Sequence, residues 1–203
     1  MFYLFPRAVR PDVCEQIVQE CKQKTFEEAG IYTYPAEVIE ADKELEVWVE
    51  NPKIRKTKVT YITDKKNKIN ELVLSYLREA NRIQFNYNLT FFQAVQFAEY
   101  KDGGFYDWHQ DEGNIDKSNE VRKLSLTLAL SNPDTFEGGE LQFYNGGRPM
   151  EDMGGITAEQ VTSDIKAQGT VVVFDSRDYH RVTPVTKGVR HSIVCWIVGP
   201  NFK

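Results

Sequence analysis

The sequence predicts an α+β protein, in which helices in the first half support a β jelly roll, or double-stranded β-helix, in the second half. After Asn88, short runs rich in β-branched and aromatic residues recur about every ten residues, separated by Gly, Pro, Asn and Asp. Strands at this spacing are typical of sandwiches and barrels. The first half instead contains two segments with apolar residues at spacings of three and four, which is the period of a helix.

The composition predicts a soluble globular protein with one domain. The 203 residues are 41% hydrophobic and 27% charged, which is ordinary for a chain with a proper core. No apolar run approaches the roughly 20 residues of a membrane helix, and the N-terminus lacks the pattern of a secretory signal. A net charge of −5 disfavours nucleic acid, whose binding depends on Lys and Arg. We expect a cytoplasmic protein with a helical support region at 1–88 and a jelly-roll core at 89–203.

The three cysteines predict neither a disulfide nor a zinc site. Cys14 and Cys21 lie seven positions apart in a predicted helix, which separates their Cα atoms by roughly 10 Å. A disulfide requires less than about 7 Å. We therefore expect these thiols to stay reduced, as in a cytosol.

Residues 2–5 predict a short strand, and a helix follows from Pro11 and Asp12 to about Lys24. Asp12 is the predicted N-cap, with Glu15 three residues later as in a capping box.

The acidic stretch at 30–53 predicts an irregular, solvated loop; the alternative is a surface that guides a basic substrate. Residues 54–63 predict a strand because they are rich in Thr and β-branched residues. A second helix is expected at 65–82, where one apolar stripe would back a sheet.

The second half predicts the strands of the jelly roll. We expect them at 90–100, 105–111, 122–131, 139–145, 169–175, 179–186 and 190–198. Gly138-Gly139 predicts a tight turn, and Lys187-Gly188 predicts a turn that joins the strand of His180 to the strand of Arg190. The long interruption at 146–166 contains two Gly pairs, and we interpret it as a lid.

The segment Tyr106–Asp111 reads Y-D-W-H-Q-D and predicts a metal site. Side chains two positions apart on a strand point the same way, so His109 and Asp111 can bind one ion. A histidine and a carboxylate make two thirds of the facial triad that holds non-haem Fe(II). The chain has three histidines, so the third ligand is His180 or His191. Taken alone, the pair would be interpreted as a surface hydrogen bond.

Four segments resemble the Fe(II)- and 2-oxoglutarate-dependent dioxygenases, specifically the prolyl 4-hydroxylase-like or PKHD-type group. They occur in the family's order within 91–198, and weaker likeness extends to residues 54–62. The segments are Y-K-D-G-G-F-Y-D-W-H-Q-D at 100–111, R-K-L-S-L-T-L-A-L-S-N-P-D-T-F-E-G-G-E-L at 122–141, G-T-V-V-V-F-D-S at 169–176 and H-R-V-T-P-V-T-K-G-V-R at 180–190.

The resemblance implies that His109, Asp111 and His180 are the catalytic iron ligands. It implies that Arg190 anchors the far carboxylate of 2-oxoglutarate, and a guanidinium can fork onto a carboxylate in this way. Alternation along this strand places His191 on the opposite face, which argues against it as a ligand. Without the resemblance, Arg190 would be interpreted as a surface residue that closes a turn.

The resemblance also implies four further residues at the co-substrate pocket. Ser192 shares the strand face of Arg190 and offers a hydroxyl donor. The others are Tyr100, Tyr106 and Trp196. The two tyrosines alone would be interpreted as core aromatics, and Gln96 is a further candidate because it faces the same way as Tyr100. Some family members place a tyrosine on the strand after the first ligand pair. This chain has none at 124–130, where Ser125 or Thr127 could replace it.

The implied activity is hydroxylation of a C–H bond, with peptidyl proline converted to 4-hydroxyproline and 2-oxoglutarate to succinate and CO₂. The implied cofactors are Fe(II), 2-oxoglutarate and O₂, with ascorbate as a further candidate, and the implied partner is a protein or peptide substrate. Three alternatives stay open: the same chemistry on a small molecule or an alkylated nucleobase, a non-catalytic jelly roll that binds a ligand, and a zinc or manganese site.

Overall fold

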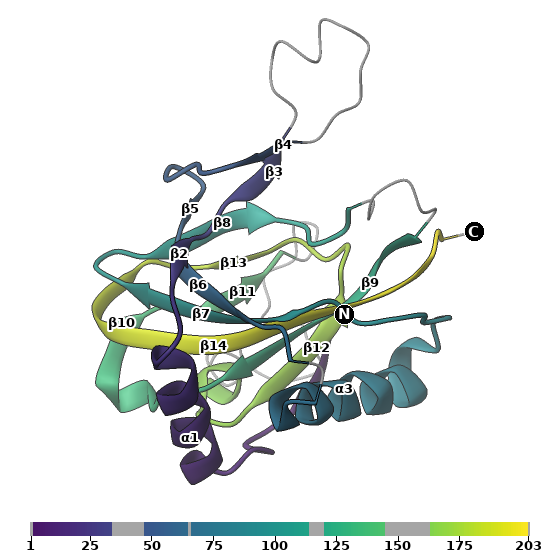
Figure 1. The fold of residues 1–203 in the computed structure, drawn as a ribbon, viewed down its shortest axis with the longest axis horizontal. Helices are drawn as coiled ribbons and strands as arrows, with labels where there is room; N and C mark the ends of the chain where they lie inside the picture. Colours follow the sequence, from purple (N-terminus) through teal and green to yellow (C-terminus); the bar gives the residue numbers. More distant parts are fainter. Residues whose placement is uncertain (1, 34–46, 65, 114–119, 145–162, 203) are drawn as a thin grey trace, which may run out of the picture.

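The computed structural model describes residues 2–33, 47–64, 66–113, 120–144 and 163–202, and its framework is a larger sheet facing a smaller one (Figure 1). The larger sheet has the order β1-β12-β9-β14-β7-β6-β2, with β10 paired to β14. Its strands are β1 (Phe2–Phe5), β12 (Val171–Asp175), β9 (Glu120–Ala129), β14 (Val185–Pro200), β7 (Val95–Lys101), β6 (Lys58–Ile62), β2 (Glu27–Glu28) and β10 (Phe136–Gly138).

The smaller sheet has the order β11-β13-β8-β5. These strands are β11 (Leu141–Phe143), β13 (His180–Val182), β8 (Phe105–His109) and β5 (Arg55–Lys56). All pairings within both sheets are antiparallel, as the jelly roll requires. A separate hairpin pairs β3 (Ile31–Thr33) with β4 (Val47–Val49).

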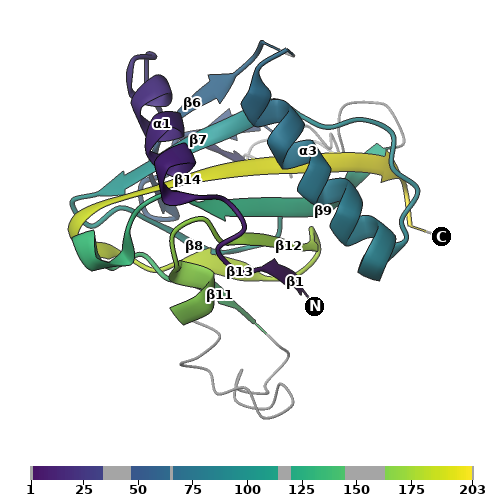
Figure 2. The same cartoon turned by 90° about the horizontal axis from the view of Figure 1, so that it is seen from below.

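Both long helices, α1 (Pro11–Lys22) and α3 (Lys68–Ala80), cover one face of the larger sheet, while β8 and β13 lie on the other side (Figures 1 and 2). The helix-facing core includes Cys14 of α1, Leu77 of α3 and Ile193 of β14. The opposite face forms a second core with Tyr100, Phe174 and other buried side chains. Central strands of the larger sheet such as β9 and β12 are therefore buried on both faces, and strand alternation decides which core a residue joins.

The first helix begins at Pro11, as predicted, but its predicted capping box is wrong. Arg10 is the N-cap and makes no side-chain capping bond, while Pro11 occupies the first helical position. Proline suits that position because its fixed φ is helical and its missing N–H would have no partner there. The carboxylate of Asp12 instead accepts hydrogen bonds from the Arg10 side chain.

The second helix begins at Lys68, where the side chain of Asn67 accepts a hydrogen bond from the Ile69 N–H. It continues beyond Ala80 as a π-helix, η1 (Asn81–Phe85), and Asn86 ends it with a φ of 53°. The predicted helix at 65–82 was therefore right in kind and shifted toward the C-terminus.

The prediction that residues 30–53 are irregular is wrong at both ends, because β3 and β4 pair there. Residues 34–46 lie outside the described residues. The predicted strand at 54–63 is divided at Thr57, whose hydroxyl donates to the Phe105 carbonyl at 3.2 Å. The division matters because β5 joins the smaller sheet and β6 joins the larger one.

The predicted turn at Lys187-Gly188 is also wrong. Both residues lie within β14, and Gly188 pairs with Phe136 of β10. Gly188 has a φ of 73°, and a Cβ there would lie 2.1 Å from the Thr135 carbonyl oxygen, so only glycine fits. His180 and Arg190 therefore lie on different sheets rather than on neighbouring strands.

At the predicted turn, Gly138 ends β10 at a register shift between Glu137 and Gly138, and both Gly138 and Gly139 have positive φ. The remaining predicted strands occur, with ends that differ by up to five residues, whereas β2 and β10 were not predicted. Most of the predicted lid, residues 146–162, lies outside the described residues. Among the described helices, none is long and apolar enough to cross a membrane.

All three cysteines are free and fully buried, so we predict that they are unreactive in the folded protein. Burial raises the pKa of Cys14 to about 11 and the pKa values of Cys21 and Cys195 to about 12. Since the thiolate is the nucleophile, a disulfide reagent at pH 8 should titrate no thiol until denaturant is added, and then all three. Rapid labelling of any thiol in the native protein would contradict this.

Candidate active site

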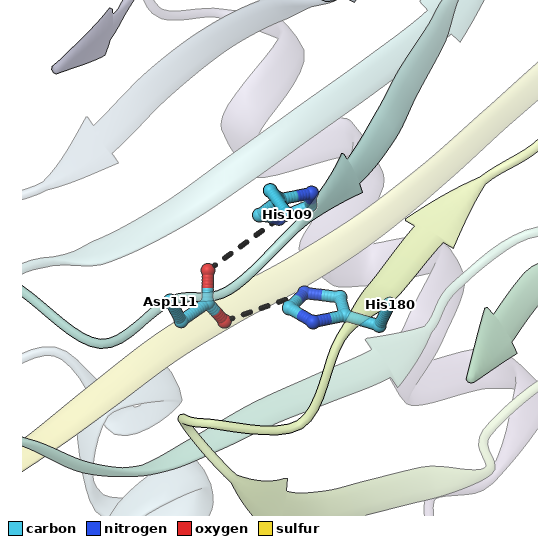
Figure 3. Close-up of side chains that lie close together, drawn as sticks. All are labelled: His109, Asp111 and His180. Carbon is cyan, nitrogen blue, oxygen red and sulfur yellow. Dashed lines mark ion pairs between the residues drawn. The ribbon is translucent and has the colours of Figure 1, made fainter. Parts of the chain in front are cut away.

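Three side chains with metal-binding atoms meet between β8 and β13 (Figure 3). His109 ends β8, Asp111 follows it by two residues, and His180 begins β13 directly opposite His109 in the strand register. The His109 Nε2 atom lies 3.6 Å from Asp111 Oδ1, and the His180 Nε2 atom lies 3.5 Å from Asp111 Oδ2. The three ligand atoms lie within 4.8 Å of one another, so one ion could contact all of them.

Both imidazoles are oriented in the same way by the backbone. The His109 Nδ1–H donates to the Asp107 carbonyl at 2.7 Å, and the His180 Nδ1–H donates to the Asp178 carbonyl at 2.9 Å. Because a carbonyl only accepts, Nδ1 carries the proton in each ring and Nε2 presents its lone pair. Metal-binding histidines are commonly fixed through the second nitrogen in this manner.

The protonation states suit metal binding at neutral pH. Burial acts to raise the pKa of Asp111, but His180 and His109 outweigh it, so the pKa lies well below its usual range. Burial lowers the pKa of His180 to about 4. An ionised carboxylate beside a neutral imidazole is the combination that a divalent metal needs.

A backbone hydrogen bond and two aromatic rings hold the three clustered side chains in place. The backbone N–H of Asp111 donates to the Ser176 carbonyl at 2.9 Å. The Tyr106 ring stacks on the His109 imidazole with 3.4 Å between centroids, and the Phe174 ring meets His180 edge-on at 4.6 Å. These contacts restrict water and limit how far either imidazole can turn.

Arg190 of β14 is a buried cation, only 6% exposed, on the inner face of the larger sheet. Its Nη1–H donates to the Ser192 hydroxyl at 3.2 Å, and its guanidinium lies 5.1 Å from the centre of the Tyr100 ring. In the part of the chain that the structure describes, Arg190 forms no ion pair. A buried guanidinium without an anion is costly, which fits a site that receives a carboxylate.

The surroundings of Arg190 leave space on this face. A Cβ at Gly139 would lie 2.8 Å from the Arg190 Cδ, so glycine makes room for the arginine. A small cavity of about 10 Å³ beside Arg190 is also lined by Thr127 and Leu141. Of the two candidates to replace the family's tyrosine, Thr127 lines this cavity, whereas Ser125 is hydrogen-bonded to the Ser176 hydroxyl at 2.9 Å.

Trp196 lies on the same strand face as Arg190 and contributes an unused donor. Its ring is 9% exposed and its indole Nε1–H is buried without a hydrogen-bond partner. The guanidinium of Arg122 lies 4.1 Å from the centre of this ring and donates to the Asp111 carbonyl. An unpartnered buried donor on the strand face of Arg190 is a second feature that fits a polar ligand.

His191, the alternative third ligand, lies on the helix-facing side of the sheet, as strand alternation predicted. Its Nε2 lies 3.1 Å from the Glu99 carboxylate, its Nδ1 lies 3.3 Å from the Ser131 hydroxyl, and its ring stacks on Phe97. It therefore has no part in the cluster.

Gln96 is less available than its strand position suggested. Its carbonyl oxygen accepts from Arg55 at 2.9 Å and its amide donates to the Tyr61 hydroxyl at 3.0 Å. The sequence assigned no role to Arg55 or Phe174. The weak likeness at 54–62 includes Arg55 and the segment at 169–176 includes Phe174, but neither segment indicates which contact the side chain makes.

The model of the 2OG-Fe(II) oxygenase superfamily matches residues 95–198, which contain the three clustered side chains and Arg190. The chain belongs to this superfamily. Membership implies Fe(II) as cofactor and 2-oxoglutarate and O₂ as co-substrates, and the histidine and carboxylate donors in the cluster fit Fe(II).

Curated relatives include PKHD-type hydroxylases. The one from Teredinibacter turnerae is 34% identical over 105 residues, covering 50% of this chain and 41% of that protein. The one from Aliarcobacter butzleri is 31% identical over 136 residues, covering 61% and 54%. The chain thus spans about half the length of the curated relatives it matches.

Solved structures confirm the predicted double-stranded β-helix fold. A Pseudomonas putida prolyl-4-hydroxylase aligns with a TM-score of 0.64 at 22% identity, covering 96% of this chain and 91% of that one. A Trichoplax adhaerens prolyl hydroxylase, in complex with a peptide of the hypoxia inducible factor, aligns with a TM-score of 0.66 at 18% identity, covering 97% and 82%.

Proposed function

We propose that this protein is an Fe(II)- and 2-oxoglutarate-dependent hydroxylase that converts peptidyl proline to 4-hydroxyproline, with 2-oxoglutarate converted to succinate and CO₂. The observation that carries the proposal is the convergence of two imidazoles and one carboxylate in a jelly roll that also holds a buried Arg190. We take residues 1–203 as a single catalytic domain.

His109, Asp111 and His180 would hold the iron through two Nε2 atoms and one carboxylate, as in the facial arrangement that leaves positions open for other ligands. With 2-oxoglutarate, the metal supplies the oxidation: one atom of O₂ enters the C–H bond, and the other enters succinate as CO₂ leaves. The residues of the chain bind, orient and shield these reactants.

Arg190 would bind the far carboxylate of 2-oxoglutarate with two parallel N–H bonds, and Ser192 would add its hydroxyl. Tyr100 lies against the guanidinium and limits its movement. The free indole N–H of Trp196 would donate to a polar group nearer the metal. Tyr106 packs on His109 and helps to exclude water.

The substrate class rests on the relatives rather than on a contact. PKHD-type hydroxylases and prolyl hydroxylases are what this chain is similar to, and one of the latter was solved with a peptide. The runner-up is the same chemistry on a small molecule or an alkylated nucleobase; the net charge of −5 weighs against nucleic acid.

We predict that a proline-containing peptide, rather than an alkylated oligonucleotide or a free amino acid, gains one oxygen atom when incubated with protein, Fe(II) and 2-oxoglutarate. Mass spectrometry measures the gain, and fragmentation places it on proline. Omission of 2-oxoglutarate is the control. Oxygen transfer to a nucleobase or a free amino acid alone would reject the peptidyl substrate and keep the oxygenase.

Replacing the carboxylate, Asp111→Ala, should abolish both metal binding and succinate production, because no neighbouring carboxylate in the described cluster can replace it. Calorimetric titration with Co(II) and a succinate assay measure the two losses. His191→Asn is the matched control, since His191 lies on the other face of the sheet and should leave both intact. Full succinate production by Asp111→Ala would remove the site assignment.

Arg190→Lys keeps the positive charge but loses the two parallel N–H hydrogen bonds, and Arg190→Met loses both the charge and the hydrogen bonds. We expect the KM for 2-oxoglutarate to rise about 10- to 100-fold, the equivalent of one hydrogen-bonded charge pair, with the larger rise in Arg190→Met. Succinate production against 2-oxoglutarate concentration measures this. An unchanged KM in both variants would exclude Arg190 from the co-substrate site.

A further inference from the structure

Tyr106 is held between a cation and one of the clustered imidazoles. On one side its ring lies nearly parallel to the His109 ring, at an angle of 12° and 3.4 Å between centroids. The guanidinium of Arg55 lies 4.4 Å from the centre of the Tyr106 ring. Arg55, Tyr106 and His109 therefore form a continuous series of contacts that ends at the cluster.

The strand pairing places Arg55 at this position. β5 pairs with β8, and Arg55 lies directly opposite Tyr106 in the register. The preceding residue, Ile54, accepts a hydrogen bond from the Asp107 N–H at 2.8 Å, and the Asp107 carbonyl accepts from the His109 Nδ1–H. Two restraints on the His109 ring thus depend on adjacent residues of the first half of the chain.

Ion pairing does not explain the position of Arg55. Its Nη1 and Nη2 donate to neutral acceptors, the Gly30 carbonyl at 3.3 Å and the Gln96 side chain at 2.9 Å. Its Nε–H is buried without a partner, and no carboxylate among the described residues forms an ion pair with it. The charged contact that remains is with the face of the Tyr106 ring, where a cation is attracted to the π system.

His109 is also the ligand that most needs such support. Its side chain is 13% exposed, compared with 6% for both Asp111 and His180. His180 is enclosed by Phe174 and Phe143, whereas Tyr106 is the aromatic ring stacked flat on His109. Loss of that ring's position would free the more exposed imidazole to rotate.

We propose that Arg55 is a positioning residue for the metal ligand His109 and acts through Tyr106. The guanidinium holds the tyrosine ring flat, and the ring holds the imidazole with its Nε2 atom toward Asp111. The inference rests on the proposed function, because it requires His109 to bind the metal. It extends the site into β5, outside the span that matches the family model.

The test is a double-mutant cycle on metal affinity, measured by titrating the metal-free protein with Co(II) in the absence of 2-oxoglutarate and substrate. Arg55→Met should weaken Co(II) binding about tenfold, the loss typical when a group that orients a metal ligand is removed. In a Tyr106→Leu background the same change should cause no further loss, since the contact is already gone. Arg55→Lys, which keeps a cation over the ring, should bind more tightly than Arg55→Met.

A second readout separates positioning from a general effect on folding. In the Co(II)-loaded protein, the paramagnetically shifted Nδ1–H proton signals of the two ligand imidazoles can be followed by NMR. Arg55→Met should shift or broaden the His109 signal and leave the His180 signal in place. Arg82→Ala, which removes an exposed arginine paired with Glu79, is the matched control and should change neither signal nor affinity.

The outcomes distinguish the inference from the proposed function. If the wild-type protein binds no Co(II), both fail. If the wild type binds and Arg55→Met binds equally well, the positioning role fails and the metal site stands. The role also fails if Arg55→Met changes only the KM for a peptide, or if its effect is equally large in the Tyr106→Leu background. Should Arg55→Met not fold, Arg55→Gln and Arg55→Lys complete the same cycle.

Discussion

The pairing of β8 with β13 is the constraint on which the site depends. It sets His180 opposite His109, although the two residues are far apart in the sequence. Asp111 follows in the same connection and is held by the Ser176 carbonyl. A buried carboxylate is costly unless a cation or hydrogen-bond donors face it, so a metal ion shared with the two imidazoles would offset the cost of burying Asp111.

Strand alternation in the larger sheet places apolar core residues on one face and the polar residues of the candidate site on the other. In β14, Ile193 and Cys195 face the helices, whereas Arg190 and Ser192 face the smaller sheet. A register slip of one residue would exchange the two sets and bury Arg190 against the helices. Apolar packing of the helices against this sheet therefore also fixes the register of the opposite face, which carries Arg190 and Ser192.

Sequence patterns correctly predicted the features that depend on interactions between residues close together in the chain. The two long helices, most strands and the opposite facing of His191 all follow from side-chain periods of 3.6 and 2. The predictions were wrong where a competing local preference, or pairing with a distant strand, determined the conformation. Proline moved the first N-cap to Arg10, and pairing with β10 kept Lys187 and Gly188 inside β14.

The sequence by itself determined the kinds of ligand available, the alternation that puts Arg190 on one face and His191 on the other, and the family. Only the tertiary structure decided that His180 joins His109 and Asp111, that Arg190 lies on a different sheet from His180, and that Arg55 reaches His109 through Tyr106. The reason is that periodicity is a property of neighbours along the chain. Contacts between the two sheets instead depend on how segments distant in the sequence pack together, and the packing of the two cores determines that arrangement.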